Sequence, residues 1–207
     1  MASPDPPPRP RGRQEVREAL LTAAERLMAE RGPSNVPLRD IADAAGVNFG
    51  LLYQYVGTRE DLLREVYQRV ARGSAERFEE LDHLSDAIDL LMNMPAGRNN
   101  VGRMMGWTAL EGAYPADVFG PSPALEQVAA LMRREAAANG HEMPDDEARL
   151  LAAFLLVTSL GWRLFRPIGL TSAGLDAGED HVGRDKQITE WLQQLTQLVI
   201  RGPHGGA

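Results

Sequence analysis

Polar and aromatic side chains suited to non-covalent recognition lie between residues 38 and 63, in the run LRDIADAAGVNFGLLYQYVGTREDLL. A helix predicted to follow Asn48 places Leu52, Tyr55 and Val56 inward. Its other side then carries aromatic, small and hydrogen-bonding residues: Phe49, Gly50, Leu51, Tyr53 and Gln54. Such a face fits the major groove of a DNA duplex, where base edges offer hydrogen-bond partners and thymine methyl groups.

The elements that must position this face are also predicted by the sequence. Apolar residues recur at helical spacing and predict a first short helix: Leu38, Ile41, Ala42 and Ala45. Gly46 ends that helix, because glycine readily adopts the left-handed backbone of a tight turn between two helices. Asn48 is a suitable N-cap for the next helix, residues 49–56, and Thr58 is one for the helix after it, with Asp61 three residues later. The pattern therefore predicts a helix-turn-helix with steeply crossing helices.

The run resembles the DNA-binding domain of the tetracycline-repressor (TetR) family of transcriptional regulators. The similar segments are RDIA of the second helix, AGV of the turn, LLYQYV of the third helix and TREDLL at the start of the fourth. Upstream, VREALLTAAERLMAERG is similar to the first helix of the family, and the likeness extends over about residues 14–70. It implies an all-α fold, with an N-terminal three-helix helix-turn-helix domain and a C-terminal helical domain for ligand binding and dimerisation.

The family's pattern, carried over residue by residue, implies two kinds of DNA contact. Phe49, Gly50 and Leu51 would meet base edges, and Arg39 would reach DNA from the second helix. Phosphate contacts are implied for four residues: Tyr53, Gln54, Tyr55 and Arg59. An arginine can hold guanine O6 and N7 with two hydrogen bonds, and tyrosine hydroxyls suit phosphate oxygens. For Tyr53 and Tyr55 the alternative is an ordinary packing role within the helices.

Two departures from the family's pattern bear on specificity. Phe49 and Leu51 are apolar where the family commonly has polar side chains, so direct readout should depend on thymine methyl groups. The few hydrogen bonds to bases should come mainly from three residues: Arg39, Asn48 and Gln54. Pro37 stands where the family usually has a threonine cap, and proline offers neither a capping oxygen nor an N–H group.

The charge of the chain is unevenly distributed. The 207 residues are 43% hydrophobic, enough for a sizeable core, and carry a net charge of −7, which is unusual for a DNA-binding protein. Residues 9–72 hold eleven arginines against nine acidic residues (net +2), and residues 73–207 hold eleven basic against nineteen acidic residues (net −8). Only the N-terminal part suits a phosphate backbone, and we expect the acidic remainder to face away from DNA.

We predict four segments along the chain. Residues 1–13 are rich in proline and arginine and predict a disordered basic arm, which either enters the minor groove or is a solvated tail. Residues 14–58 form the helix-turn-helix domain. Residues 59–201 form the helical effector-binding and dimerisation domain, which begins with a linker helix over 59–81. Residues 202–207 form a disordered tail.

The C-terminal part keeps a helical pattern. Helices are predicted over residues 83–94, 98–111 and 123–138. The segment 145–165 is apolar nearly all round, so it needs partners on several sides, whereas 187–200 has a single apolar stripe.

In the resembling family the last two long helices pair with those of a second copy as a four-helix bundle, so the resemblance implies a homodimer. The corresponding interface residues are Leu151, Phe154, Leu155, Thr158, Trp191, Leu195 and Leu198. A homodimer also suits a palindromic operator, because the two half-sites need two recognition helices related by a two-fold axis. The glycine-rich stretch 169–183 is predicted to be a long acidic loop between these helices.

An effector pocket is expected in the middle region, residues 92–162. Flexible, aromatic and anchoring polar side chains suited to line it are Arg103, Met104, Trp107, Thr108, Glu111, Tyr114, Phe119 and Trp162. For each of them the alternative is a place in the plain helical core. The sequence does not identify the ligand.

Patterns for catalysis, metal binding and export are missing from the sequence. The four histidines lie in different segments without companions at ligand spacing, and no phosphate loop or nucleophile motif occurs. There is no cysteine, no signal segment and no apolar run of membrane-spanning length. We therefore expect a cytoplasmic protein that is not an enzyme and has no cofactor, no metal and no membrane partner.

The resulting hypothesis is a sequence-specific transcriptional repressor that a small apolar or aromatic effector releases from its operator. An activator and a regulator that needs a co-repressor would have the same sequence features. A helical small-molecule-binding protein without specific DNA binding is a further alternative, which negligible affinity for any duplex would favour.

Overall fold

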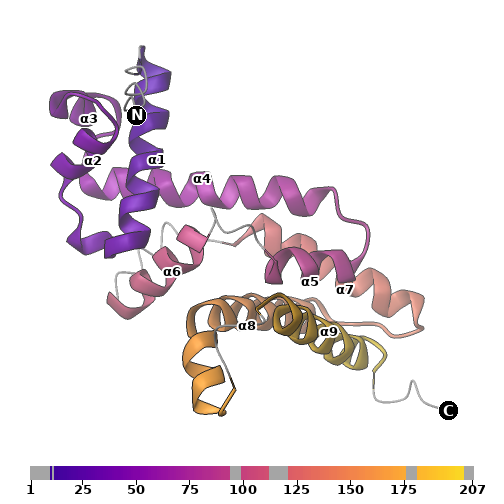
Figure 1. Ribbon diagram of the computed structural model, residues 1–207. Helices are drawn as coiled ribbons and strands as arrows, with labels where there is room; N and C mark the ends of the chain where they lie inside the picture. The colour runs from indigo at the N-terminus through magenta and orange to yellow at the C-terminus, as the bar shows by residue number, and fades with distance from the viewer. Residues whose placement is uncertain (1–9, 11, 94–98, 112–120, 176–180, 203–207) are drawn as a thin grey trace, which may run out of the picture. The chain divides into compact units, whose positions relative to one another are not determined.

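The computed structural model describes residues 10, 12–93, 99–111, 121–175 and 181–202, and all regular structure within these ranges is helical (Figure 1). The predicted all-α fold is confirmed. The elements are α1 (Arg13–Arg31), the 3-10 turn η1 (Pro33–Asn35), α2 (Leu38–Ala44), α3 (Phe49–Tyr55), α4 (Arg59–Glu79), α5 (Leu84–Met92), α6 (Asn99–Glu111), α7 (Pro123–Ala138), α8 (Asp145–Ser172) and α9 (His181–Ile200).

The described residues fall into two compact units. The first contains α1, η1, α2, α3, the part of α4 up to Val70 and the part of α6 from Arg103. The second contains the remainder of α4 and α6 together with α5, α7, α8 and α9. The boundary predicted between residues 58 and 59 differs from this division, because much of α4 and α6 belongs with the helix-turn-helix.

In the first unit, α1 is the platform on which α2 and α3 pack. An apolar stripe of this helix is buried: Val16, Leu20, Ala23 and Leu27. Helices α2 and α3 each contact α1 and also contact one another. Ile41, Ala42 and Leu52 are fully buried among these three helices. The small side chain of Ala42 permits a close crossing, which holds α3 in a fixed direction.

The turn between α2 and α3 has the geometry that its residue types predict. Gly46 has a φ of +66°, in the left-handed region where other residues are strained. The Asn48 side-chain oxygen accepts a hydrogen bond from the Gly50 N–H at 2.9 Å, so the predicted N-cap of α3 is confirmed. Helix α2 begins after Pro37 without a side-chain cap. This agrees with the absence of a capping oxygen on proline.

A reciprocal capping box closes the start of α4. The Thr58 N–H donates to Asp61 Oδ2 at 2.9 Å, and the Asp61 N–H donates to Thr58 Oγ1 at 3.2 Å. The Thr58 backbone donor, then the Thr58 hydroxyl and the Arg64 guanidinium, hold the pKa of Asp61 below its ordinary value. The cap predicted at Thr58, with Asp61 three residues later, is confirmed.

The core of the second unit is formed by α5, α7, α8 and α9. Helix α7 packs along α8. The side of α8 that faces the core carries small and apolar residues at helical spacing: Ala148, Ala152, Leu155 and Ser159. Leu155 is only 1% exposed and belongs to the main apolar cluster of this unit.

Helix α8 is longer than the sequence predicts. We expected it to end near Phe165, before Pro167, but it continues to Ser172. A proline inside a helix removes one backbone hydrogen bond and crowds the preceding turn, which usually ends the helix. Here Leu170 is buried beyond the proline, and this packing favours one more helical turn. The first residues of the predicted loop 169–183 are therefore helical.

By length and composition alone, α8 could cross a membrane, with a mean hydropathy of 1.5 over an 18-residue window. This differs from the expectation that no segment reaches membrane-spanning length. Only 22% of that window is buried inside the structure. One side of α8 is therefore covered by its own chain, while much of its apolar surface is exposed.

Truncating Leu155 tests whether this residue belongs to the core. We expect Leu155→Ala to lower the free energy of unfolding by about 2–5 kcal/mol, because a buried leucine side chain is lost and a cavity remains. Chemical denaturation monitored by circular dichroism measures the change. Leu110→Ala, at an exposed leucine of α6, is the control and should change little. A Leu155 variant with unchanged unfolding would show that its side chain is not part of the core.

The capping box predicts a pH-dependent contribution from Asp61. Because its pKa is lowered in the folded protein, its stabilisation is complete above the ordinary aspartate pKa of about 3.9 and is lost as the pH falls through the folded value. Asp61→Asn should therefore lower the melting temperature at pH 6, and the difference from the unmodified protein should shrink below about pH 4. Asp43→Asn controls for charge removal in the same unit. A difference that stays constant down to pH 3 would contradict the role of the charge.

Candidate nucleic-acid interface

Helix α3 presents one side to solvent and packs its other side on the helices of the first unit. Leu52 and Val56 are buried, as predicted. Gly50 and Gln54 are exposed, and Tyr53 is 53% exposed. Phe49 and Leu51 are half-buried at the start of the helix. The Asn48 side-chain oxygen is used by the cap, so only its amide N–H groups remain available to a base or phosphate.

The exposed side of α3 is organised by ring contacts that the sequence did not predict. The rings of Phe49 and Tyr53 meet edge to face, with centroids 5.3 Å apart and an interplanar angle of 87°. The guanidinium carbon of Arg39, from α2, lies 5.7 Å from the centroid of the Phe49 ring. Residues from both helices of the helix-turn-helix thus form one continuous group, which we call the Arg39–Phe49–Tyr53 cluster.

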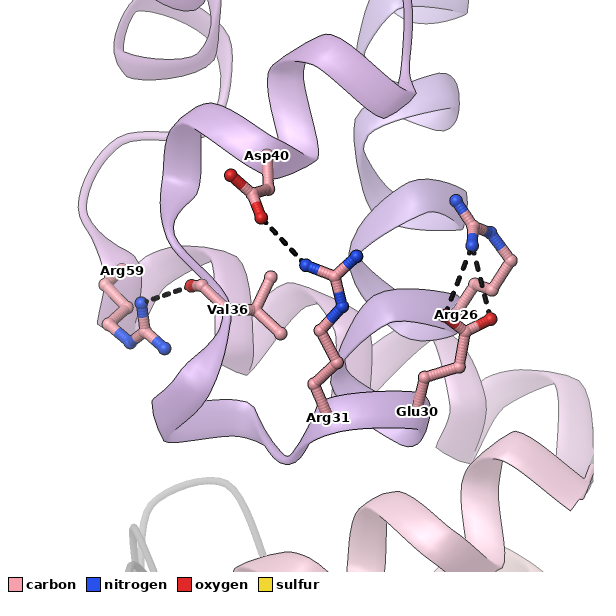
Figure 2. Close-up of polar contacts among 6 residues, drawn as sticks. All are labelled: Arg26, Glu30, Arg31, Val36, Asp40 and Arg59. Atoms are coloured by element: carbon pink, nitrogen blue, oxygen red, sulfur yellow. Dashed lines mark hydrogen bonds and ion pairs between the residues drawn. The ribbon is translucent and has the colours of Figure 1, made fainter.

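Arg39 is a cation of this face that is available to a ligand. Its side chain is exposed, and within the described part of the chain it has no hydrogen bond or ion pair beyond the contact with Phe49. The neighbouring Asp40 is instead paired with Arg31 at 2.8 Å (Figure 2). Pairing of this carboxylate reduces its repulsion of a phosphate backbone, which favours DNA near Arg39.

Tyr55 lies closer to the interior than Tyr53. It is half-buried, and the guanidinium carbon of Arg13, at the start of α1, lies 5.9 Å from its ring centroid. This arrangement agrees with the packing alternative for Tyr55, whereas the exposure of Tyr53 agrees with a contact to DNA. Arg13, the last residue of the predicted basic arm, is instead the first residue of α1, and its position beside Tyr55 depends on the packing of α1 on α3.

Arg59 has a different environment from the one expected of a phosphate-binding residue. Its guanidinium donates to the backbone oxygen of Val36 at 2.8 Å (Figure 2). It also donates to the backbone oxygen of Pro33. These carbonyl groups belong to the segment between α1 and α2, which has few other partners for them. Arg59 therefore holds this segment against the start of α4, and its phosphate contact stays a prediction.

Five of the expected effector residues lie on α6, in the same unit as the helix-turn-helix: Arg103, Met104, Trp107, Thr108 and Glu111. Met104 and Thr108 are buried, and the Thr108 hydroxyl is hydrogen-bonded to the hydroxyl of Tyr67. Arg103 is exposed. Two of these side chains therefore serve the internal packing of the first unit.

Trp107 and Glu111 contact the segment that follows α1. Glu111 accepts a hydrogen bond from the Ser34 hydroxyl at 2.6 Å. A side chain at Gly32 would place its Cβ 3.2 Å from Trp107 and 3.0 Å from Glu111, and Gly32 also has a φ of +84°. Glycine is thus required here for both space and backbone conformation.

Trp162 is in the second unit, where its indole N–H donates to Asp185 at 2.8 Å. The remaining two expected effector residues, Tyr114 and Phe119, lie outside the described residues. The expected set is therefore divided between the two units. Sequence reasoning could not separate packing residues from pocket residues, because both classes are apolar or aromatic.

The expected dimer residues include both exposed and buried side chains. Four are exposed: Phe154, Trp191, Leu195 and Leu198. Leu151 and Thr158 are half-buried, and Leu155 is in the core, so its assignment to an interface is corrected. The exposed side of α8 carries further large apolar residues that the sequence prediction missed: Leu150, Val157, Phe165 and Ile168. Their spacing follows that of Phe154, but the pattern is hidden because α8 is apolar on nearly every side.

Within the described ranges, no group of three or more histidine, aspartate or glutamate side chains could hold a metal ion. The chemistry that this face offers is therefore hydrogen bonding, ring contact and charge attraction. An exposed helix side with a cation and aromatic rings fits a DNA groove in shape and chemistry.

Comparison with known proteins supports this description. The family model of the bacterial regulatory proteins, tetR family, matches residues 20–66, which contain the whole of α2 and α3. The chain is similar to the HTH-type transcriptional repressor Rv3405c of Mycobacterium tuberculosis, with 33% identity over 174 residues that cover 81% of this chain and 82% of the relative. It is also similar to the HTH-type transcriptional regulator TtgR of Pseudomonas putida, 34% identical over 88 residues, which are 39% of this chain and 41% of the relative.

Solved structures show the same fold over most of the chain. Salmonella enterica GusR matches with a TM-score of 0.65 and 17% identity, covering 88% of this chain and 95% of that chain. A transcriptional regulator from Rhodococcus sp. Rha1 matches with a TM-score of 0.62 and 19% identity, covering 90% and 96%. Together with a curated relative that is 33% identical over four-fifths of the chain, the helix-turn-helix and its exposed face lead to one conclusion. The chain belongs to the TetR family of bacterial regulatory proteins.

Proposed function

We propose that this protein is a sequence-specific DNA-binding transcriptional regulator that acts in the cytoplasm. The observation that carries the proposal is the exposed Arg39–Phe49–Tyr53 cluster on a helix-turn-helix whose other side is fully packed on α1. Asn48, Gly50, Leu51 and Gln54 complete the reading face, with base contacts near the start of α3 and phosphate contacts at Tyr53 and Gln54. The rigid apolar support beneath α3 favours a fixed alignment in the major groove.

The regulator acts as a homodimer on a palindromic operator. Exposed large apolar side chains on α8 and α9 support this part of the proposal, because a soluble monomer rarely leaves so many of them uncovered. Phe154, Trp191 and Leu195 are central to the proposed interface, whereas Leu155 is not. A two-fold dimer presents two α3 helices to two half-sites.

We further propose that the bound regulator represses transcription and that a small apolar or aromatic effector releases it. The relative in Mycobacterium tuberculosis is named a repressor, which supports this direction of regulation. Release requires that the effector bind the DNA-free conformation more tightly than the DNA-bound one. An effector that binds the protein but leaves operator affinity unchanged would contradict the coupling.

Selection on random duplex DNA tests the reading face. The unmodified protein should enrich an inverted repeat. Arg39→Ala should weaken binding by about 1–3 kcal/mol and relax the preference at one base position, because a bidentate contact to guanine is lost. Tyr53→Phe should weaken binding to all sequences alike, because a hydroxyl contact to phosphate carries no base information.

A matched control for these variants is Arg26→Ala. Arg26 is an exposed arginine of α1 that is paired with Glu30 on the same helix (Figure 2), and its loss should leave DNA binding nearly unchanged. Equal losses at every base position for Arg39→Ala and Tyr53→Phe would contradict their separate roles. Failure of the unmodified protein to enrich any sequence, with and without candidate ligands, would contradict sequence-specific DNA binding.

Charges placed on the exposed side of α8 and α9 test the dimer. We expect the double variant Phe154→Glu/Leu195→Glu to sediment as a monomer and to lose tight operator binding, because two uncompensated charges would be buried in each half of the interface. Leu110→Glu, at an exposed leucine of α6, is the control and should remain dimeric. A double variant that still sediments as a dimer would place the interface elsewhere on the chain.

A further inference from the structure

Arg39 and Phe49 come from two different helices but form one recognition surface. The Arg39 guanidinium carbon lies 5.7 Å from the centroid of the Phe49 ring, within the range of a cation–π contact. The ring is held in turn by its edge-to-face contact with Tyr53, at a centroid distance of 5.3 Å. The orientation of the guanidinium is thus restrained before DNA is present, which lowers the entropy cost of ordering it on a base.

The separation of the two groups limits which bases they can reach. Successive base pairs of B-DNA are about 3.4 Å apart along the axis. A guanidinium and a ring 5.7 Å apart therefore fall within two base-pair steps of each other, and adjacent base pairs are within their common reach. In the major groove the guanidinium matches guanine O6 and N7, and the aromatic ring matches the methyl group of thymine.

We propose that Arg39 and Phe49 read two adjacent base pairs of the operator as a single unit, a guanine through the guanidinium and a thymine through its methyl group. This inference rests on the proposed function. It adds that each half-site must contain a guanine directly beside a thymine, which we call the base step. The two contacts depend on one another, because the Phe49 ring both packs on the methyl group and orients Arg39.

Two carboxylates of this unit, Asp40 and Asp61, are already paired with other groups. Asp40, the next residue of α2, pairs with Arg31 at 2.8 Å, and Asp61 is bound by Thr58 and Arg64. Arg59 donates to backbone oxygens and not to the reading face. In the described part of the first unit, no carboxylate is paired with Arg39, so its guanidinium keeps its donors for a base.

Single-atom changes in the DNA test the proposal without altering the protein. In the operator obtained by selection, each thymine is replaced in turn by deoxyuridine, which removes only the methyl group, and each guanine by 7-deazaguanine, which removes only N7. For the unmodified protein we expect about a fourfold loss of affinity at one thymine of each half-site, as for one buried methyl group. A loss of fivefold or more is expected at the guanine directly beside it.

Three variants assign these effects to residues. Phe49→Ala should abolish the sensitivity to deoxyuridine at that thymine, and Arg39→Ala should abolish the sensitivity to 7-deazaguanine at the neighbouring guanine. Phe49→Leu keeps apolar bulk but has no ring, so it should retain the thymine effect while the guanine effect decreases. Arg26→Ala, at the exposed arginine of α1 that is paired with Glu30, is the control and should retain both effects. Circular dichroism melts verify that each variant is folded at the assay temperature.

The possible results separate this inference from the proposed function. An enriched operator in which the methyl-sensitive thymine is not adjacent to the 7-deaza-sensitive guanine would overturn the paired reading while leaving a DNA-binding regulator in place. The paired reading is also overturned, and the DNA-binding regulator also kept, if either sensitivity survives in the variant expected to remove it. If no operator is enriched, the proposed function itself fails, and the base step fails with it.

Discussion

The close packing of α2 and α3 on α1 is the constraint on which the rest of the site depends. Ile41, Ala42 and Leu52 are fully buried at this junction, and burial of a leucine or isoleucine side chain contributes about 1.5–3 kcal/mol. The small side chain of Ala42 sets how closely the helices approach, and the left-handed backbone at Gly46 sets the turn between them. Because α2 and α3 are held together in this way, Arg39 on one helix lies beside Phe49 on the other.

Sequence reasoning succeeded where a short local pattern determines the structure. The cap at Asn48, the capping box at Thr58 and the inward side of α3 each depend on residues a few positions apart, with polar and apolar side chains on opposite faces. It failed on α8, where apolar residues lie on nearly every side. Phe154 and Leu155 are equally suited to a core by type, and only packing against α7 assigns Leu155 to the interior.

The hydrogen-bond partners of polar side chains were not predicted, for a different reason. The guanidinium of Arg59 suits a backbone carbonyl as well as a phosphate, and it donates to the backbone oxygens of Pro33 and Val36. Residue type does not distinguish these partners, because the position of the η1 segment relative to α4 is a tertiary property. The same holds for Thr108, whose hydroxyl is bonded to Tyr67, forty-one positions away in the sequence.

Two kinds of surface can cover the exposed apolar side of α8: a lipid bilayer or a second protein. A bilayer surrounds a whole helix, yet one side of α8 is already occupied by α7, with Leu155 in the core between them. Arg163 and Arg166 lie within the apolar stretch and are bound inside the unit, to the Leu91 carbonyl and to Asp185 at 2.6 Å. An arginine at the centre of a membrane-spanning helix costs about 2.5–3.5 kcal/mol even on the most favourable scale. A second copy of the chain needs to cover only the exposed side and leaves these contacts intact, so the geometry of α8 favours dimerisation over insertion.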